Sequence, residues 1–185
     1  MFKFTQKATI SGVAEMSLFR TACLIFPAIV LAGCFGAKEP PPPPPPPTKV
    51  EIRIEAAADV NPGAQGQGAP VLLRIYELKE LAGFNGADFF ALYDKDQSAL
   101  GGDLARKREL LLRSGEKQTL NFEAESGASF IAAYAAFRNL DSARWRVSAP
   151  IIPHRDNVFE LKLGGVQMKL TALPLPPEPP VAPEK

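Results

Sequence analysis

The segment "NVFELKLGGVQMKLTAL" (residues 157–173) decides the fold class. Its two halves, residues 157–163 and 166–173, alternate apolar with polar side chains, which is the period of a half-buried β-strand. Between them lies Gly164-Gly165, and glycine tolerates the positive φ angles that a tight hairpin turn requires. The segment therefore predicts two antiparallel strands that place one apolar face against a core.

The same alternation recurs toward the N-terminus. Residues 49–55 place Val50, Ile52 and Ile54 on one face and charged side chains on the other. Such a strand can cover a core with one face and meet water with the other. Further strands are predicted over residues 70–78, 117–125, 129–138 and 144–152.

Three segments carry a weaker pattern. The alanines of residues 129–138 permit a helix as well as a strand, and residues 106–116 favour a strand with a helix as the alternative. Residues 81–103 show no alternation, and the helical spacing of Ala87 and Phe90 predicts short helices. Seven or eight short strands with a small helical insertion predict an antiparallel β-sandwich.

The N-terminus is predicted to be an export signal. Residues 21–33 form an uncharged, mostly apolar run, which is too short to cross a bilayer but suits a secretory signal. Its end, Leu31-Ala32-Gly33-Cys34, resembles the bacterial lipobox, in which the cysteine becomes the first mature residue and takes a diacylglycerol. A chance cysteine after an ordinary signal is the alternative. Translation from Met1 or from Met16 would give the same mature chain.

Proline-rich segments flank the predicted domain. The run Pro40–Pro47 favours a polyproline rod of roughly 25 Å, because each residue of such a rod rises about 3.1 Å. A ligand for an aromatic groove is the alternative function of this run. The predicted organisation is a signal peptide at 1–33, an acylated cysteine and spacer at 34–48, a β-sandwich at 49–173 and a disordered tail at 174–185.

The composition offers little for catalysis. A net charge of +1 over 185 residues gives no electrostatic reason to expect nucleic acid. His154 is the single histidine, and it lies in a predicted loop. Asp94, Asp96 and Asp103 match a calcium loop only loosely, and no cluster has the spacing of metal ligands. We therefore expect no catalytic residue, no metal, no small-molecule substrate and no cofactor beyond the diacylglycerol and N-acyl lipid on Cys34.

The first connection between predicted strands is unusually long. Residues 59–69 separate two strands that are predicted to be neighbours, whereas hairpin loops commonly have two to five residues. Asn61-Pro62-Gly63 is a turn signature within it. Long loops at the end of a rigid sandwich often carry recognition, although a tolerated insertion without function is the alternative.

Several motifs in order resemble one family, the outer-membrane lipoproteins of type VI secretion called TssJ. After the lipobox come Asn61-Pro62 behind the first strand, Arg74 to Leu78 in the second, and Phe89 to Tyr93 in the insertion. Phe137-Arg138 and Trp145-Arg146 follow. The resemblance covers roughly residues 49–173.

The resemblance implies a transthyretin-like β-sandwich with a small helical addition and a structural, non-catalytic role. It implies a lipid anchor in the outer membrane, facing the periplasm, and binding to the periplasmic C-terminal region of the inner-membrane protein TssM. In this family the loop between the first two strands contacts TssM. Carried over to this chain, the contact candidates are Val60, Asn61, Pro62, Gly63 and Gln65.

Other motif residues receive other roles. Tyr76, Phe137 and Trp145 are predicted to lie in the core or on a sheet face, and Arg138 and Arg146 to pair with surface carboxylates. The competing functional hypotheses are a generic periplasm-facing sandwich lipoprotein, acting as an inhibitor or a carbohydrate- or peptidoglycan-binding module, and a periplasmic hydrolase. The single loop histidine disfavours the hydrolase.

Overall fold

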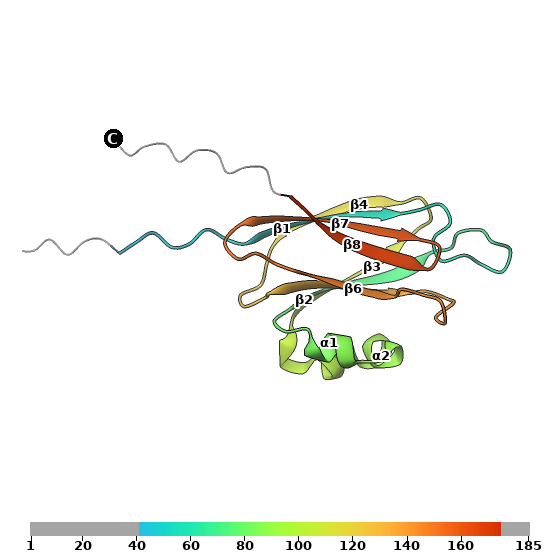
Figure 1. Ribbon diagram of the computed structural model, residues 1–185, viewed down its shortest axis with the longest axis horizontal. Helices are drawn as coiled ribbons and strands as arrows, with labels where there is room; N and C mark the ends of the chain where they lie inside the picture. The colour runs from blue at the N-terminus through green and yellow to red at the C-terminus, as the bar shows by residue number, and fades with distance from the viewer. Residues whose placement is uncertain (1–40, 175–185) are drawn as a thin grey trace, which may run out of the picture. The chain divides into compact units, whose positions relative to one another are not determined.

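The computed structural model describes residues 41–174. The predicted signal at 1–33, Cys34 and the tail from residue 175 onward lie outside the described residues. Residues 43–174 belong to one compact unit, a sandwich of two sheets with helices on one outer face (Figure 1). Because the strands are short and mostly amphipathic, two sheets packed face to face bury their apolar sides together.

Each sheet contains four strands. The first has the order β4–β1–β7–β8, formed by β1 (Lys49–Ala56), β4 (Lys117–Glu123), β7 (Asp156–Gly164) and β8 (Gln167–Leu173). The second has the order β3–β2–β5–β6, formed by β2 (Val71–Leu78), β3 (Leu104–Leu112), β5 (Phe130–Ala136) and β6 (Arg146–Pro150). The predicted β-sandwich is thus confirmed, and both segments that also permitted a helix, residues 106–116 and 129–138, are strands over most of their length.

The hairpin that predicted the fold class is present, with its turn shifted by one residue. β7 and β8 pair antiparallel, and Gly164 lies opposite Gln167. The two turn residues are therefore Gly165 and Val166, and not Gly164-Gly165. Only Gly165 of the two glycines uses the positive φ angle that motivated the prediction, at 52°.

One expectation about strand pairing is wrong. β1 and β2 are not neighbours, because they belong to different sheets. β1 instead lies between β4 and β7 and runs parallel to β7, with Ile52 opposite Phe159. The long first connection crosses from one sheet to the other, which explains why it exceeds the length of a hairpin loop.

The main core lies between the two sheets. Its fully buried side chains include Ile52, Leu73 and Leu161, which alternate with outward-facing residues along their strands. Glu77 is also fully buried, and its carboxylate accepts hydrogen bonds from the Arg108 side chain and the Glu125 backbone N–H. This pairing compensates the burial of the charge at the edge of the core.

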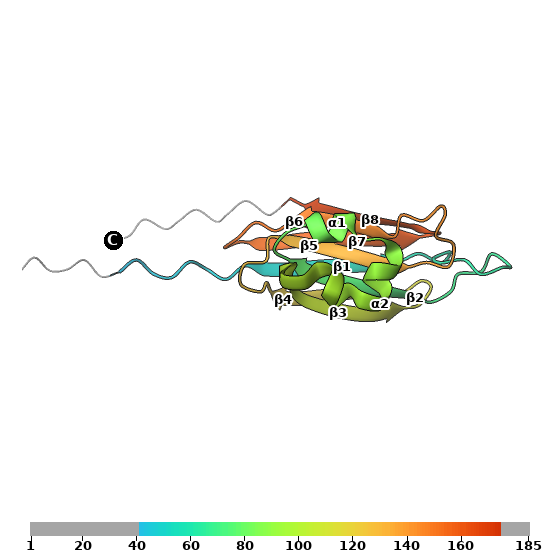
Figure 2. The ribbon, with the colours of Figure 1, turned by 90° about the horizontal axis from the view of Figure 1, so that it is seen from below.

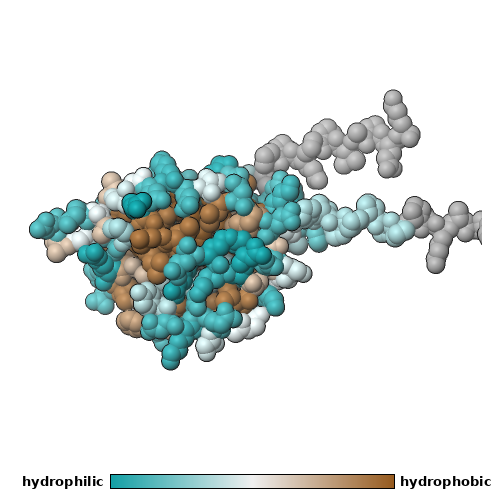
Figure 3. All heavy atoms as spheres, turned by 180° about the vertical axis from the view of Figure 1, so that it is seen from behind, coloured by the Kyte–Doolittle hydropathy of each residue, from teal (hydrophilic) through white to brown (hydrophobic). Residues whose placement is uncertain are grey.

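The core between the two sheets is covered less completely on the side of the sandwich formed by β3 and β4. A hydrophobic area is visible on this side (Figure 3). β3 and β4 contribute the half-buried Leu110, Leu120 and Phe122 to the core. Arg108 reaches from β3 across to β4 and places its guanidinium 3.6 Å from the centre of the Phe122 ring.

The predicted helical insertion covers the outer face of the second sheet (Figure 2). It consists of α1 (Ala82–Gly86), α2 (Phe89–Leu100) and the 3₁₀ turn η1 (Gly101–Asp103). A second, smaller core lies beneath these helices and is formed by Tyr76, Leu78, Phe84, Leu92, Leu100, Ala132 and Tyr134. β2 and β5 are therefore buried on both faces, which is why residues 129–138 show little alternation.

Candidate functional site

The candidate site is the loop of residues 57–70, hereafter the crossover loop, which connects β1 to β2. It projects from one end of the sandwich, and Pro43–Thr48 leaves from the opposite end (Figures 1 and 2). This separation follows from the chain path, because the proline segment precedes β1 and the loop follows it. An eight-residue strand spans about 26 Å.

Asn61 fastens the base of the crossover loop. Its side-chain nitrogen donates to the Pro70 carbonyl (2.7 Å), and its side-chain oxygen accepts from the Arg138 backbone N–H (2.8 Å). Its own backbone N–H donates to the Gly165 carbonyl (2.7 Å). Asn61 has a φ of 48°, and asparagine adopts this left-handed conformation more readily than most residues. One residue thus joins the start of the loop to its last residue, to the segment after β5 and to the β7–β8 turn.

The first two predicted contact residues are buried. Val60 is 0% exposed and belongs to the main core, and Asn61 is 2% exposed. The assignment of these two side chains to a contact surface is therefore corrected: both hold the loop in place from the inside. The Asn-Pro-Gly signature indicated a turn, but it could not show on which side of the loop each side chain lies.

The remaining predicted residues belong to the outer part of the loop. Pro62 and Gly63 are half-buried, whereas Gln65 is exposed together with Ala64, Gly66 and Gln67. The tip closes on itself, because the Gly63 N–H donates to the Gln67 carbonyl (2.8 Å) and the Gly66 N–H to the Gly63 carbonyl (3.0 Å). Residues 63–67, hereafter the loop tip, therefore present a short ordered turn with two glutamine amides.

Gly68 is required where the loop returns to the domain. A Cβ atom at this position would lie 2.1 Å from the Ala58 carbonyl oxygen, which is closer than real atoms approach. The same carbonyl accepts a hydrogen bond from the Ser114 hydroxyl, and the Ala57 carbonyl accepts from the Gly115 N–H. The two sides of the loop base are thus in close contact with each other and with the β3–β4 turn.

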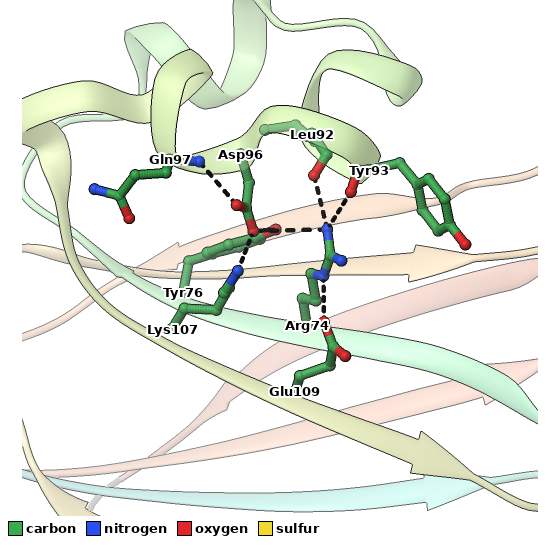
Figure 4. Close-up of polar contacts among 8 residues, drawn as sticks. All are labelled: Arg74, Tyr76, Leu92, Tyr93, Asp96, Gln97, Lys107 and Glu109. Atoms are coloured by element: carbon green, nitrogen blue, oxygen red, sulfur yellow. Dashed lines mark hydrogen bonds and ion pairs between the residues drawn. The ribbon is translucent and has the colours of Figure 1, made fainter.

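Sequence reasoning missed a buried polar network beneath α2 (Figure 4). Arg74 of β2 donates to the carbonyls of Leu92 and Tyr93 (2.8 Å each) and forms an ion pair with Glu109 (2.7 Å). Its Nη1 atom lies 3.6 Å from Asp96. The alternation of β2, which places Arg74 and Tyr76 on one face, was the signal that could have indicated a polar partner above that face.

Asp96 is the centre of this network on the helix side. It accepts hydrogen bonds from Lys107 (2.8 Å), from the Tyr76 hydroxyl (3.1 Å) and from the Gln97 backbone N–H (2.8 Å). Burial acts to raise the pKa of the Asp96 carboxyl, but the hydrogen bond and charge of Lys107 hold this pKa below its ordinary value. Burial raises the pKa of Tyr76, so its hydroxyl remains a hydrogen-bond donor to the Asp96 carboxylate. The network attaches α2 to β2 and β3.

The other motif residues mostly occupy the predicted places. Tyr76 and Phe137 are buried, and Trp145 is half-buried against both cores. Within residues 41–174, Arg146 does not pair with a carboxylate: its guanidinium donates to the carbonyls of Phe84 and Ala87 and lies 4.7 Å from the Trp145 ring centre. Arg138 is exposed, and its backbone N–H donates to Asn61.

His154 contacts the proline segment that precedes β1. Its backbone N–H donates to the Thr48 hydroxyl (2.8 Å), and its Nδ1 lies 3.1 Å from the Pro46 carbonyl oxygen. Among residues 41–174, no group of three or more His, Cys, Asp or Glu side chains is arranged to hold a metal ion. Within the same range, no helix has both the length and the apolar character that a membrane span requires.

A family model and solved structures match this chain. The family, described as type VI secretion lipoprotein (VasD, EvfM, TssJ), matches residues 48–166. The crystal structure of the lipoprotein TssJ1 from Pseudomonas aeruginosa is 41% identical with a TM-score of 0.68, and the match covers 71% of this chain and 100% of that chain. Among curated proteins, none matches the chain.

Two further structures are similar over the same domain. Lip from Serratia marcescens, described as a membrane-bound component of the type VI secretion system, is 26% identical with a TM-score of 0.62, and the match covers 68% of this chain and 98% of Lip. A chain in a structure described as the TssM C-terminal domain from EAEC is 25% identical with a TM-score of 0.53, covering 69% of this chain and 99% of that chain. The family match and the resemblance to TssJ1 agree with the order of motifs, and the chain therefore belongs to the TssJ family of type VI secretion lipoproteins.

Proposed function

We propose that this lipoprotein is anchored in the outer membrane through acyl chains on Cys34 and binds the periplasmic C-terminal region of TssM with the crossover loop. In this way it would connect the outer membrane to the trans-envelope complex of a type VI secretion system. Its role is structural and not catalytic. The observation that carries the proposal is the position of the crossover loop at the end of the sandwich opposite to the proline segment.

The anchor follows from the lipobox. Acylation of Cys34 would bury many methylene groups, each contributing about 0.8 kcal/mol, so several acyl chains hold a protein on a membrane effectively permanently. Phe35 follows Cys34, and it is not the aspartate that retains many such lipoproteins in the inner membrane. The lipid and the proline spacer together would leave the sandwich facing the periplasm.

The partner-binding part of the proposal now rests on the loop tip. Gly63 and Gln65 belong to the tip, and Pro62 directly precedes it, whereas Val60 and Asn61 support it from the interior. The loop is held at its base by the hydrogen bonds of Asn61. A preformed loop loses little conformational entropy on binding, which favours affinity. TssM is the proposed partner because this chain resembles a chain in the structure described as the TssM C-terminal domain.

Membrane fractionation tests the anchor. Cys34→Ser removes the thiol that takes the lipid, so we expect the protein to move from the outer-membrane fraction to the soluble periplasmic fraction. Secretion should be lost, because the connection to the outer membrane is broken. A variant that still sediments with the outer membrane would show that another segment supplies the attachment.

Direct binding tests the partner. Replacement of the loop tip by Asn-Gly, a pair that suits a tight turn, should leave Asn61 and the fold in place. We expect the affinity for the purified TssM periplasmic region to fall at least tenfold in a titration of the mature chain. Glu123→Ala is the control, because Glu123 is exposed on the edge strand β4 and lies opposite Lys49, at the end from which the proline segment leaves. Unchanged affinity of the tip variant would place the site elsewhere.

A further inference from the structure

The loop tip is small for a specific interface. A stable protein–protein interface buries about 800 Å² on each partner and is dominated by a few large side chains. The exposed tip residues are Ala64, Gln65, Gly66 and Gln67, which include neither an aromatic nor a large aliphatic side chain. If the crossover loop binds TssM, the neighbouring surface must supply most of the buried apolar area.

Exposed apolar side chains lie at the same end of the second sheet. Leu72 follows the crossover loop on β2, and the strand register places it directly between Leu111 of β3 and Ala136 of β5. Leu111 is 65% exposed, whereas Leu72 and Ala136 are half-buried. The three side chains form one apolar row on the outer face of the sheet, beside the beginning of β2.

Helix α2 carries two exposed aromatic rings over the same sheet. Phe90 is 63% exposed and Tyr93 is 44% exposed, and their spacing of three residues places them on one face of the helix. Tyr93 and Tyr76 lie on opposite sides of Arg74 (Figure 4). Leu72 and Tyr76 also lie on opposite sides of Arg74 along β2, so Tyr93 lies on the Leu72 side. Its ring centre is 5.6 Å from the Arg74 guanidinium.

The network beneath α2 holds the ring of Tyr93 in place. Arg74 donates to the carbonyl of Tyr93, and the ring of Tyr93 stacks on that of Phe89 at 6.0 Å. Phe89 in turn packs edge-to-face against Trp145 of the sheet at 5.4 Å. Tyr93 is therefore an ordered aromatic side chain that is partly open to solvent, as binding hot spots commonly are before a partner covers them.

We infer that Leu72, Leu111, Ala136, Phe90 and Tyr93, hereafter the apolar patch, extend the TssM-binding surface from the crossover loop onto α2. The inference rests on the proposed function, because the patch is assigned to the partner that contacts the loop. Its occupant would be an apolar or aromatic side chain of the TssM periplasmic region, seated beside Leu111 and Tyr93. Polar contacts from the loop tip would then orient a partner that the apolar patch holds.

The chain offers a matched control for a substitution in the patch. Ile152 is a large apolar side chain with 49% exposure, but it follows β6 at the end from which the proline segment leaves. A single exposed apolar residue is common on protein surfaces and needs no partner. Leu111→Asp and Ile152→Asp therefore introduce the same charge at similarly exposed positions, one inside the apolar patch and one far from it.

Affinity for the purified TssM periplasmic region tests the inference, with the mature lipoprotein in detergent micelles. We expect Leu111→Asp to raise the dissociation constant at least tenfold and Tyr93→Ser to raise it at least threefold. Ile152→Asp should raise it less than twofold. Thermal unfolding of each variant checks the fold. Should Leu111→Asp unfold, a photo-crosslinking amino acid at position 111 should capture the TssM region and the same group at 152 should not.

The outcomes separate this inference from the proposal on which it rests. Loss of affinity on replacing the loop tip, with wild-type affinity for Leu111→Asp and Tyr93→Ser, would overturn the apolar patch alone. Failure of the unmodified lipoprotein to bind the TssM region would overturn both. An equal loss of affinity in Leu111→Asp and Ile152→Asp would also overturn the patch. Added charge at any exposed site would then be enough to weaken binding.

Discussion

At the scale of single residues, Asn61 shows how a polar side chain in a loop can have a structural role. The family resemblance suggested a contact residue, yet the nitrogen and the oxygen of its side-chain amide both form hydrogen bonds with backbone groups of the domain. The backbone groups that it satisfies, the Pro70 carbonyl and the Arg138 N–H, are far from it in sequence. No local pattern could have indicated them. The sequence predicted where the loop is, and the fold determined which of its residues are free to bind.

Substitution of Asn61 should destabilise the domain. Asn61→Ala removes two hydrogen bonds to partly buried backbone groups and places alanine, which tolerates a left-handed conformation less well than asparagine, at a φ of 48°. We expect a loss of about 3 kcal/mol in the free energy of unfolding, measured by chemical denaturation. Asn61→Gly, which tolerates the positive φ, should lose about 2 kcal/mol because only the hydrogen bonds are removed. Wild-type stability in both variants would contradict the assigned role.

Asp96 should make stability depend on pH. Its pKa is lower in the folded protein than in the unfolded chain, so its contribution is present above the ordinary aspartate pKa of about 3.9 and is lost as pH falls through the folded value. We expect Asp96→Asn to lower the free energy of unfolding by about 2 kcal/mol at pH 7. The difference from the wild-type protein should shrink as pH falls below about 4. A difference that stays constant from pH 7 to pH 3 would contradict this account.

At the scale of elements, the sequence predicted strands far better than their neighbours. Alternation is a local property, so β1, β4, β7 and β8 were recognisable from their half-buried pattern. Pairing depends on contacts between distant segments, and the parallel pair of β1 with β7 joins the first strand to the seventh. The prediction of β1 and β2 as neighbours failed because proximity in sequence was the only guide. The apolar patch was likewise hidden, since it combines residues from β2, β3, β5 and α2.

The N-terminal cap of α2 gives a prediction for an element. The Asp88 side chain accepts a hydrogen bond from the Ala91 backbone N–H (2.8 Å), which satisfies one of the free donors of the first helical turn. Asp88→Ala should therefore lower the free energy of unfolding by about 1 kcal/mol. Asp94→Ala, an exposed position further along the same helix, serves as the control and should change stability by less than about 0.5 kcal/mol. Equal effects of the two substitutions would argue against the cap.

At the scale of the whole molecule, the sandwich separates the proline segment from the loop that is proposed to bind the partner. The proline segment precedes β1 and the crossover loop follows it, so the folded domain holds them at opposite ends. The hydrogen bond from the His154 backbone N–H to the Thr48 hydroxyl adds a contact between the domain and the residue that precedes β1. The order of proline segment, first strand and loop could be predicted from the sequence, because it is an order along the chain. The burial of Val60 and Asn61 could not, because it depends on how the loop returns to β2.

Shortening the spacer tests the role assigned to the proline run. Deletion of Pro40–Pro43 would remove about 12 Å of a polyproline rod and leave Pro46, which contacts His154, unchanged. We expect secretion to fall while domain stability stays at the wild-type value. Replacement of the same four prolines by four other residues that favour an extended chain should preserve secretion. If secretion is indifferent to the length, the run is a passive linker and the spacer interpretation is wrong.

Site-specific photo-crosslinking in cells tests the central claim most directly. A photo-reactive amino acid at Gln65, on the exposed loop tip of the full-length protein, should form a covalent adduct with TssM in the membrane fraction. The same amino acid at Arg53, on the exposed outer face of β1, should form no such adduct. Abundant TssM adducts at Arg53, with none at Gln65 and none at Leu111, would contradict binding of TssM at the end of the sandwich that carries the crossover loop.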